Sequence, residues 1–416
     1  MTQSHKVATD VFDVAICGAG PAGLAAALAA SQAGLSVAIA GPRADQNDGR
    51  TAALFASSVQ FLKTIGVWHL LDTAAEPLRA IRLVDATGAL FRAPEVTFRA
   101  CEIGLDAFGY NIPNAVLTSA LERALEGHVQ RFLSSVTSCD ISSDPVLSIQ
   151  SGETIGARLI GAADGRHSLV RDAAGIGVKS WHYPQAAVVT SFKHSRPHFG
   201  ISTEFHRKAG PLTVVPGPGQ TSSLVWVEAP DAAKRLAQLD DVQFAISLER
   251  QLCGVLGKLS AFAPRRAYPL SGQTAERFAQ KRIALIGEAG HVIPPIGAQG
   301  LNLSFRDAAI FAQVAQETKD QTGDAGSPAA IEHYHNKRAS DVSSRVWTVD
   351  VLNRSLLSEY LPVHLMRGLG LFALQTTGPL RRILMREGVS PAFSTPKFMQ
   401  SANLPAPVAV SGLDRQ

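Results

Sequence analysis

Cysteine is scarce in this sequence, and its four cysteines lie far apart. Among 416 residues, Cys17, Cys101, Cys139 and Cys253 form no CxxC pair. Disulfide frameworks of small secreted domains and structural zinc sites both need closely spaced cysteines, so neither is expected here. We interpret the four as reduced, mostly buried thiols of a cytoplasmic protein, and we expect no metal site.

Long apolar runs and strong net charge are also missing. No stretch approaches the roughly 18 uninterrupted apolar residues of a membrane-spanning helix, and residues 1–10 lack the apolar core of a secretion signal. A formal net charge of +4, from 39 basic and 35 acidic side chains, is too small to indicate nucleic-acid binding. The sequence is 46% hydrophobic and long enough for about two or three domains, so a substantial core is expected.

What the sequence does contain is glycine in three informative places. The first is the string GAGPAG at residues 18–23, between an apolar segment at 12–17 and an alanine-rich segment at 21–33. The apolar segment is typical of a buried parallel strand, and the alanine-rich one of a helix that stops at a glycine. A second strand is predicted at 35–40. This order of strand, GxGxxG, helix and strand predicts a dinucleotide-binding unit.

Each glycine of this string has a physical reason. Gly18 allows a tight turn, Gly20 lets the backbone approach a pyrophosphate, and Gly23 lets helix and strand pack closely. The N-terminus of the helix then presents its positive dipole end to the phosphates. A glycine turn without a ligand is the alternative, because GxGxxG alone is a weak motif.

The acidic residue that usually binds a ribose at the end of the second strand is missing. Gly41 stands there, and the next carboxylates are Asp45 and Asp48. Either one of these reaches back, or the ribose hydroxyls lack this bond. Arg43 could instead meet the 2′-phosphate of NADP. Two later motifs favour a flavin dinucleotide, because a nicotinamide cofactor does not require them.

The second glycine segment is ADGR at residues 163–166, after a short apolar strand predicted at 158–163. The pair Asp164-Gly165 breaks this strand, and Ser168 can cap a helix that follows. Because DG pairs are also common turns, the segment alone does not distinguish a turn from a binding site.

The third segment follows a strand predicted at residues 282–286. It runs from Gly287-Glu288 through the string PPIGAQGLN at 294–302 into a helix that starts at about Gln299. Glu288 can accept hydrogen bonds from sugar or ribityl hydroxyls, and free backbone N–H groups at the helix start favour the negative charge of a reduced flavin. A loop made rigid by its two prolines is the alternative, but it does not explain the glycines.

With these motifs the sequence resembles the FAD-dependent aromatic hydroxylases of the para-hydroxybenzoate hydroxylase class, and more narrowly the hydroxylases of ubiquinone biosynthesis. In that family the arginine at the Arg50 position packs near the flavin, and the polar residue at the Asn114 position contacts it. The resemblance covers nearly the whole chain, through GRTAAL at 49–54, GYNIPN at 109–114, segments at 204–205, 210–212, 223–226 and 268–270, and PPIGAQGLN, which is the most specific.

The resemblance implies an α/β fold: a doubly wound FAD-binding domain with an inserted antiparallel substrate sheet and C-terminal helices. Alternating apolar residues at 186–192 and 222–227 agree with such a sheet. The expected boundaries are 1–78, 105–175 and 277–345 for the FAD-binding domain, 79–104 and 176–276 for the sheet, 346–400 for the helices, and 401–416 for a disordered tail.

The resemblance also implies a function, which is NAD(P)H-dependent hydroxylation of a phenolic, polyprenylated ring with O2 in ubiquinone biosynthesis. FAD is the expected cofactor, and NAD(P)H is a transient co-substrate. The expected cofactor-binding residues are Gly18, Gly20, Gly23, Arg50, Asn114, Asp164, Gly165, Gly287, Glu288, Pro294, Gly297, Gly300, Leu301 and Asn302.

No catalytic residue can be assigned from the sequence. His182, His194, His198 and His206 could polarise a phenol, but a lone histidine in a sheet more often has a structural role. His291 lies beside the third glycine segment, where a structural hydrogen bond is favoured over acid–base work.

Three departures from the family pattern leave alternatives open. Glu288 replaces an aspartate and is one methylene longer, Gly41 replaces the acidic ribose residue, and Pro113 replaces a glutamate that often precedes the Asn114 position. They motivate a non-catalytic or weakly FAD-binding scaffold protein of a quinone-synthesis assembly. A reductase or halogenase of the same fold is a further alternative, although the tryptophans form no WxWxIP-like halogenase string.

The C-terminal region at residues 361–387 is apolar and carries four arginines. In its last part Leu380, Ile383 and Leu384 fall on one helical face and the arginines on the other. Either this helix covers the core with a solvated basic face, or it lies on an anionic membrane surface. The second reading suits a substrate that lives in the bilayer. It predicts a cytoplasmic protein peripheral to the inner membrane, associated with other quinone-synthesis proteins.

Overall fold

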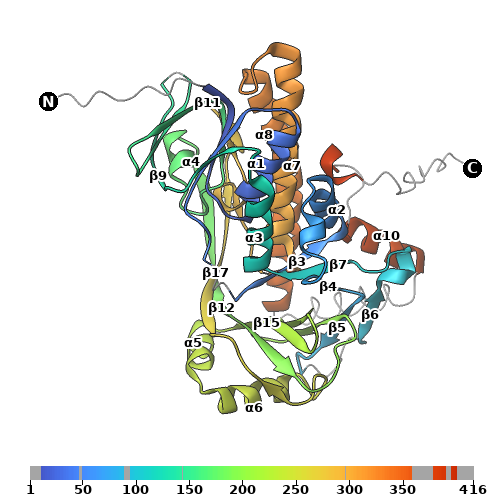
Figure 1. The fold of residues 1–416 in the computed structure, drawn as a ribbon. Coiled ribbons are helices and arrows are strands. Elements are labelled where there is room, and N and C mark those ends of the chain that lie inside the picture. The colour runs from blue at the N-terminus through green and yellow to red at the C-terminus, as the bar shows by residue number, and fades with distance from the viewer. Residues whose placement is uncertain are drawn as a thin grey trace, which may run out of the picture.

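The computed structural model of this protein describes residues 11–45, 49–88, 94–142, 144–295, 297–357, 378–389 and 395–400. They form an α/β part above a largely antiparallel sheet, as Figure 1 shows. The predicted fold class is confirmed. Among the described residues, no helix is both long enough and apolar enough to cross a membrane. The predicted tail at 401–416 and residues 361–377 of the predicted C-terminal region lie outside the described residues.

The first sheet is largely parallel and is built around β1 (Val11–Cys17), which pairs with β2 (Val37–Ala40) on one side and β11 (Thr154–Ala162) on the other. Residues 14–17 of β1 are all buried, which explains their continuous apolar character. The strand order is β18-β19-β11-β1-β2-β8. The outer strands are β8 (Gln130–Phe132), β18 (Ala279–Gln280) and β19 (Ile283–Leu285).

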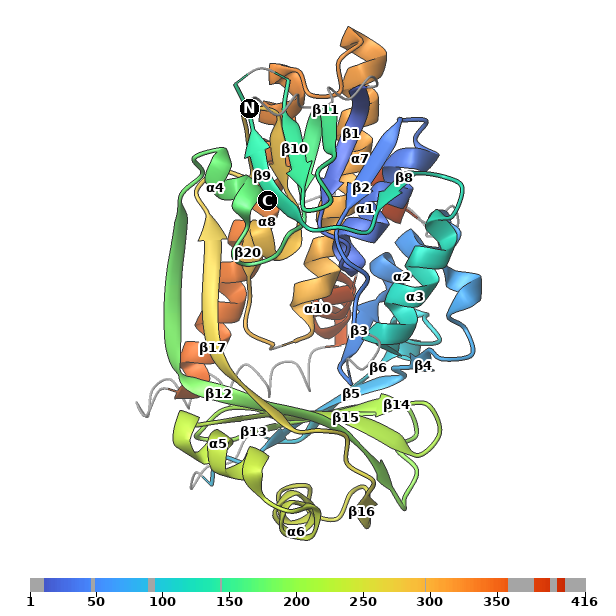
Figure 2. The same ribbon diagram turned by 60° about the vertical axis from the view of Figure 1, so that its left-hand side comes forward.

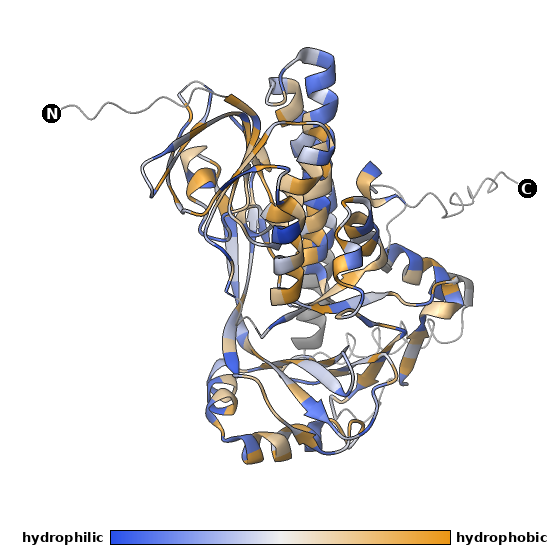
Figure 3. Cartoon of the chain, viewed as in Figure 1, coloured by the Kyte–Doolittle hydropathy of each residue, from blue (hydrophilic) through white to orange (hydrophobic). Residues whose placement is uncertain are grey.

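Both faces of this sheet are covered. Helices α1, α3 and α7 pack on one face in the largest core cluster, and the hairpin of β9 and β10 covers the other with α4. Figure 3 shows that hydrophobic residues predominate in these strands and in α1. The elements are α1 (Pro21–Gln32), α3 (Asn114–Leu125), α4 (Leu169–Ala173), α7 (Gln299–Thr322), β9 (Val136–Asp140) and β10 (Val146–Ile149).

The second sheet has the order β20-β17-β12-β15-β14-β13-β5-β6, with β16 paired to β12. Helices α5 (Pro230–Gln238) and α6 (Asp241–Gln251) cover its outer face. Its strands are β5 (Ala80–Asp85), β6 (Val96–Arg99), β12 (Val178–His194), β13 (Ile201–His206), β14 (Leu212–Gly217), β15 (Thr221–Glu228), β16 (Leu259–Ser260), β17 (Arg266–Ala275) and β20 (His291–Val292).

Two long strands join the α/β part to this second sheet. Strand β12 has 17 residues and pairs with β17 along most of its length. Figure 2 shows both strands running from the upper part of the molecule into the lower sheet. A small third sheet of β3 (Thr51–Phe55), β4 (Glu76–Pro77) and β7 (Gly109–Pro113) lies between the two parts.

The expectation that most of the cysteines are buried is wrong. Cys17 is the one buried cysteine, whereas Cys101 and Cys253 are exposed, because one lies in a short surface 3-10 helix (Ala100–Ile103) and the other in the turn after α6. In α10 (Gly378–Val389), Ile383 is 59% exposed, which disagrees with the reading that this apolar face covers the core and agrees with the membrane-surface reading.

Arg381 takes the inward position of α10. Its guanidinium pairs with Glu102 at 2.7 Å and lies 4.6 Å from the centre of the Phe98 ring, so this arginine is not on a solvated face. Met385, one turn further on, is buried beside Phe108. The arrangement follows from partners on a distant segment that helical periodicity does not reveal.

Substitution of Phe244 in α6 would test the packing of the core under the second sheet. It is fully buried, with ring centres 5.2 Å from Phe262 and 6.0 Å from Trp226. We expect Phe244→Ala to lower the free energy of unfolding by about 3–5 kcal/mol, because the change leaves a cavity. Urea unfolding followed by tryptophan fluorescence would measure it. Val242→Ala, on the same helix but 66% exposed, should change it by less than about 0.5 kcal/mol. Equal losses of stability in the two variants would contradict the packing described for this core.

Candidate functional site

The three glycine segments meet at the carboxyl ends of neighbouring parallel strands. Strand β11 lies between β1 and β19, and the backbone continues to pair just beyond their ends. Ala163 N donates to Cys17 O at 2.7 Å, and Ile286 N donates to Ala162 O at 2.8 Å. Ligands of open α/β sheets bind at this edge, so the segments predicted to share one cofactor are brought together.

The GAGPAG turn is packed so closely that side chains are excluded at two positions. A Cβ atom on Gly18, whose φ is +108°, would lie 2.2 Å from Ala163 O, and one on Gly23 would lie 2.0 Å from Gly18 O. Gly20 is different, because no atom lies within 4 Å of its Cβ position. Two glycines therefore bring helix and strand together, and the third leaves open space at the start of α1.

The second segment adds a carboxylate with one buried oxygen. Asp164 Oδ2 accepts a hydrogen bond from Val170 N at 3.2 Å, whereas Oδ1 is buried with no partner in the described part of the chain. Burial is the largest influence on Asp164 and raises its pKa, against hydrogen bonds from Ser168 and the backbone that lower it. A buried acceptor needs a donor, and the hydroxyls of a dinucleotide are donors. Gly165 has a φ of +84°, which suits glycine.

The predicted cap of the following helix is present. Ser168 Oγ accepts a hydrogen bond from Arg171 N at 2.9 Å at the start of α4. The cap fixes the turn that carries Asp164 and Gly165.

The third segment begins with a short 3-10 helix (Gly287–Ala289) directly after β19. A Cβ atom on Gly287 would lie 3.5 Å from the Cβ of Ala22, so this turn lies against the start of α1. The side chain of Glu288 is exposed, and it makes no hydrogen bond or ion pair with the described residues. Its carboxylate therefore has open acceptors near the first glycine turn.

Asp307, inside α7, holds this turn in place. Its Oδ2 accepts a hydrogen bond from Gly287 N at 2.7 Å and lies 2.7 Å from His291 Nε2. His291 is only 2% exposed, which supports the structural reading of this histidine. Asp307 Oδ1 accepts a hydrogen bond from Arg338 Nε at 2.6 Å.

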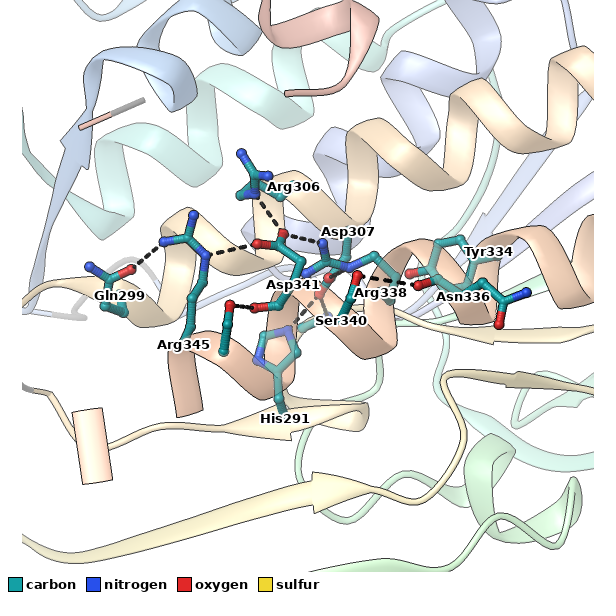
Figure 4. A network of polar contacts seen from close by, with 12 residues as sticks. His291, Gln299, Arg306, Asp307, Tyr334, Asn336, Arg338, Ser340, Asp341 and Arg345 are labelled. Atoms are coloured by element: carbon teal, nitrogen blue, oxygen red, sulfur yellow. Dashed lines mark hydrogen bonds and ion pairs between the residues drawn. The ribbon is translucent and has the colours of Figure 1, made fainter. Parts of the chain in front are cut away.

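A buried charge network extends from this aspartate to the start of α7 (Figure 4). Arg338 and Arg306 both donate to Asp341 Oδ2, at 2.6 and 2.8 Å. Arg345 donates to Asp341 Oδ1 at 3.0 Å and to Gln299 Oε1 at 3.1 Å. Burial would raise the pKa of Asp341, but the three arginines outweigh it and hold that pKa far below its usual range. Helix α8 (Pro328–Leu357) thus ties the turn at Gly287 to the first residue of α7.

The start of α7 is shaped by two consecutive residues in the left-handed region. Gly297 has a φ of +66°, and Ala298, which precedes the helix, has a φ of +52°. Gly297 and Gly300 are exposed, with no atom within 4 Å of either Cβ position. The backbone can therefore approach a ligand here, at the positive end of a 24-residue helix.

Asn302 is predicted to contact the cofactor at the start of α7, and its side-chain amide is hydrogen-bonded within the protein. Its Oδ1 accepts hydrogen bonds from Phe55 N at 2.9 Å and Ser58 Oγ at 2.7 Å, and its Nδ2 donates to Ala53 O at 2.8 Å and Ala298 O at 2.6 Å. Its side chain therefore fastens the start of α7 to β3.

The remaining predicted residues lie around the same edge. Asn114 N donates to Arg50 O at 3.0 Å, which places the start of α3 beside the start of β3. The Arg50 side chain is exposed. Pro294 is buried, and Leu301 packs partly buried against the largest core cluster.

The absence of a ribose-binding carboxylate at position 41 has a steric explanation. A Cβ atom on Gly41 would lie 2.8 Å from Ala19 N, inside the first glycine turn. Gly41 O also accepts a hydrogen bond from Arg131 Nη1 at 2.7 Å. Of the two substitutes that the sequence offers, Asp48 lies outside the described residues.

Sequence reasoning missed Asp307, Arg338 and Asp341. The one available indication was charge inside apolar helices, because buried carboxylates and guanidinium groups are rare unless paired. Their partners come from separate elements, so spacing along the chain could not have matched them.

Comparisons with known proteins show the family of the chain. The FAD binding domain family matches residues 11–348. The chain is 34% identical to ubiquinone hydroxylase UbiL of Rhodospirillum rubrum over 392 residues, which cover 92% of this chain and 90% of that protein. It is 30% identical to the 3-demethoxyubiquinol 3-hydroxylase of Escherichia coli, with 89% of this chain and 96% of that protein covered.

Solved structures share the fold. The p-nitrophenol 4-monooxygenase PnpA from Pseudomonas putida aligns with a TM-score of 0.72 at 17% identity, covering 91% of this chain and 97% of that one. Klebsiella pneumoniae HpxO, complexed with FAD and uric acid, aligns with a TM-score of 0.70 at 19% identity, covering 90% and 96%. At these identities the likeness shows the fold alone.

The two kinds of glycine in the first turn should respond differently to alanine. Gly20→Ala adds a methyl group into open space, so we expect the unfolding midpoint of the protein without cofactor to stay unchanged. The dissociation constant for FAD should rise by roughly tenfold or more, because the methyl group blocks the approach of the backbone to the pyrophosphate. Gly23→Ala forces a methyl group against Gly18 O, and should cost about 1–3 kcal/mol of stability. Chemical denaturation and quenching of FAD fluorescence measure the two effects. Unaltered FAD affinity in Gly20→Ala would refute this placement.

Asp307→Asn should be strongly destabilising. An amide nitrogen would face Arg338 or the Gly287 N–H, both of which are donors, and the buried guanidinium would lose a charged partner. We expect a loss of about 3–5 kcal/mol in the free energy of unfolding. Asp320→Asn, on an exposed position of the same helix, should change it by less than about 0.5 kcal/mol. Comparable losses in the two variants would argue against the network.

Proposed function

We propose, from the premise that this chain belongs to the FAD binding domain family, that it hydroxylates a phenolic, polyprenylated ring of ubiquinone biosynthesis with NAD(P)H and O2. The predicted enzyme class, an FAD-dependent monooxygenase, is confirmed by the family and by the relatives. The observation that carries the proposal is the convergence of three glycine segments at one sheet edge, with open space over Gly20 and a buried acceptor at Asp164.

The residues present fit an FAD. The open turn at Gly20 and the N-terminus of α1 would hold the pyrophosphate, and the start of α7 at Gly297 and Gly300 would lie at the flavin ring. Asp164 and Glu288 offer acceptors for hydroxyl groups of the cofactor. FAD supplies the redox chemistry when bound, through reduction by NAD(P)H and activation of O2.

The chain itself contributes position, charge and exclusion of water. Backbone N–H groups at the start of α7 favour negative charge at the flavin edge. The second sheet carries an apolar cluster of Tyr183, Ala187, Val227 and Leu270, which would keep water from the ring of the substrate. The network around Asp307 keeps the turn and the helix start in fixed relation without a ligand.

We extend the proposal to membrane contact through residues 361–387, on the cytoplasmic side of the inner membrane. Of this segment, the described part is α10, where the exposed Ile383 lies between the exposed Arg382 and Arg386. An apolar side chain flanked by cations suits the surface of an anionic bilayer. Association with other quinone-synthesis proteins stays a prediction.

A second candidate is a scaffold that binds FAD weakly or not at all. Gly41 and Glu288 motivate it, because both depart from the family pattern at the cofactor. The close packing of Gly41 against Ala19 gives that departure a structural reason independent of cofactor loss.

One experiment separates the two functions. We expect the purified protein, after incubation with FAD, to show the visible bands of oxidised flavin and to consume NAD(P)H faster when a prenylphenol is added. Mass analysis should find a product one oxygen atom heavier than the phenol. A colourless protein that takes up no FAD would support the scaffold, and consumption without an oxygenated product would point to a reductase or oxidase.

A further inference from the structure

The two faces of the second sheet have different neighbours. Phe205, Val214 and Trp226 lie in the cluster covered by α5 and α6, so their side chains mark the outer face. The other face meets the small third sheet, because Thr51 Oγ1 donates to Ser223 Oγ at 2.9 Å. Figure 2 shows α5 and α6 below this sheet and the α/β part above it. We call the face that carries Ser223 the inner face.

Glu204 belongs to the inner face by strand register. Val225 is two residues from Ser223 on β15 and therefore shares its face. Val225 lies opposite Thr213, and Thr213 lies opposite Glu204. Two strand spacings, about 10 Å, thus separate Glu204 from Val225. Val225 packs against the apolar cluster of Tyr183 and Leu270, so Glu204 is a polar group at the margin of an apolar surface.

The Glu204 carboxylate is held by two neighbours but is not saturated. Its Oε1 lies 2.8 Å from His206 Nε2, and its Oε2 accepts a hydrogen bond from Thr213 Oγ1 at 3.1 Å. Each carboxylate oxygen can accept two hydrogen bonds, so acceptor capacity remains on both. The side chain is 14% exposed, which leaves a narrow part that a ligand can reach.

The charge of Glu204 is maintained in this setting. Burial would raise its pKa, but the His206 ring and the Thr213 hydroxyl outweigh burial and hold the pKa below its ordinary value. The group is therefore a carboxylate at neutral pH. A buried carboxylate is a poor means of stabilising a sheet, because its desolvation offsets much of the attraction to its partners. A role in binding gives a reason for the charge.

We propose that Glu204 accepts a hydrogen bond from the hydroxyl of the phenolic substrate and so orients the ring on the inner face. This inference rests on the proposed function, and names the group that recognises its substrate. The apolar cluster takes the hydrocarbon part, and Glu204 takes the one polar group that a phenol presents. A hydrogen bond to a charged acceptor is about twice as strong as one to a neutral acceptor, which gives the orientation its selectivity.

The test compares a prenylphenol with its O-methyl ether, which cannot donate a hydrogen bond. Each is titrated into the FAD-loaded protein, and binding is followed by the change in the visible flavin spectrum. We expect the wild type to prefer the phenol by roughly tenfold or more. Glu204→Gln keeps the size of the side chain and removes the charge. It should reduce that preference by about tenfold, leaving ether affinity and FAD content unchanged.

Glu228→Gln is the matched control. Glu228 is 16% exposed, pairs with Arg207 at 2.8 Å, and accepts a hydrogen bond from Trp226 Nε1 at 3.0 Å, on the outer face of the same sheet. We expect it to keep the wild-type preference. If Glu204→Gln keeps the full preference, or weakens phenol and ether equally, the inference fails while the proposed function stands. If the FAD-loaded wild type binds neither compound, both fail.

Discussion

The structure depends on how closely three strand ends approach one another. Gly18 and Gly23 leave no room for a side chain, so α1 begins directly against the end of β11, and Ala163 O lies where a larger residue would place its Cβ. This contact turns the N-terminus of α1 toward the edge where β1, β11 and β19 end. The turns that carry Asp164 and Glu288 leave β11 and β19, so their positions follow from the same geometry.

Much of this arrangement could be predicted from the sequence because its causes are local. Glycine spacing, continuous apolar strands and the Ser168 cap each reflect constraints within a few residues, and the structure contains all three. The side-chain partners could not be predicted. Asn302 binds Phe55, which lies 247 residues away, and Arg381 binds Glu102 at a separation of 279 residues. Periodicity carries no information about such pairs, so the inward position of Arg381 in α10 could not be predicted.

The two faces of the second sheet have different roles, although the same strands form both. On the outer face, aromatic rings such as Phe244 supply stability through packing under α5 and α6. The inner face carries apolar groups such as Val225, the hydroxyl of Thr213 and the carboxylate of Glu204. Alternation along each strand lets neighbouring residues serve stability and recognition separately. The long strands β12 and β17 then carry this surface into the α/β part.

The connectivity of the first sheet also has a consequence for folding of the chain during translation. Its central strand, β1, pairs with β11 through Val11 opposite Gly156, and β11 pairs with β19 through Ile160 opposite Ile283. Contacts between such remote segments form slowly, because long loops must close first. During translation, β1 must wait with one open edge until β11, which ends at Ala162, has left the ribosome. The other edge of β11 then waits for β19 at Ile283–Leu285. Chaperone protection of the exposed edge of β1 would therefore matter most early in synthesis.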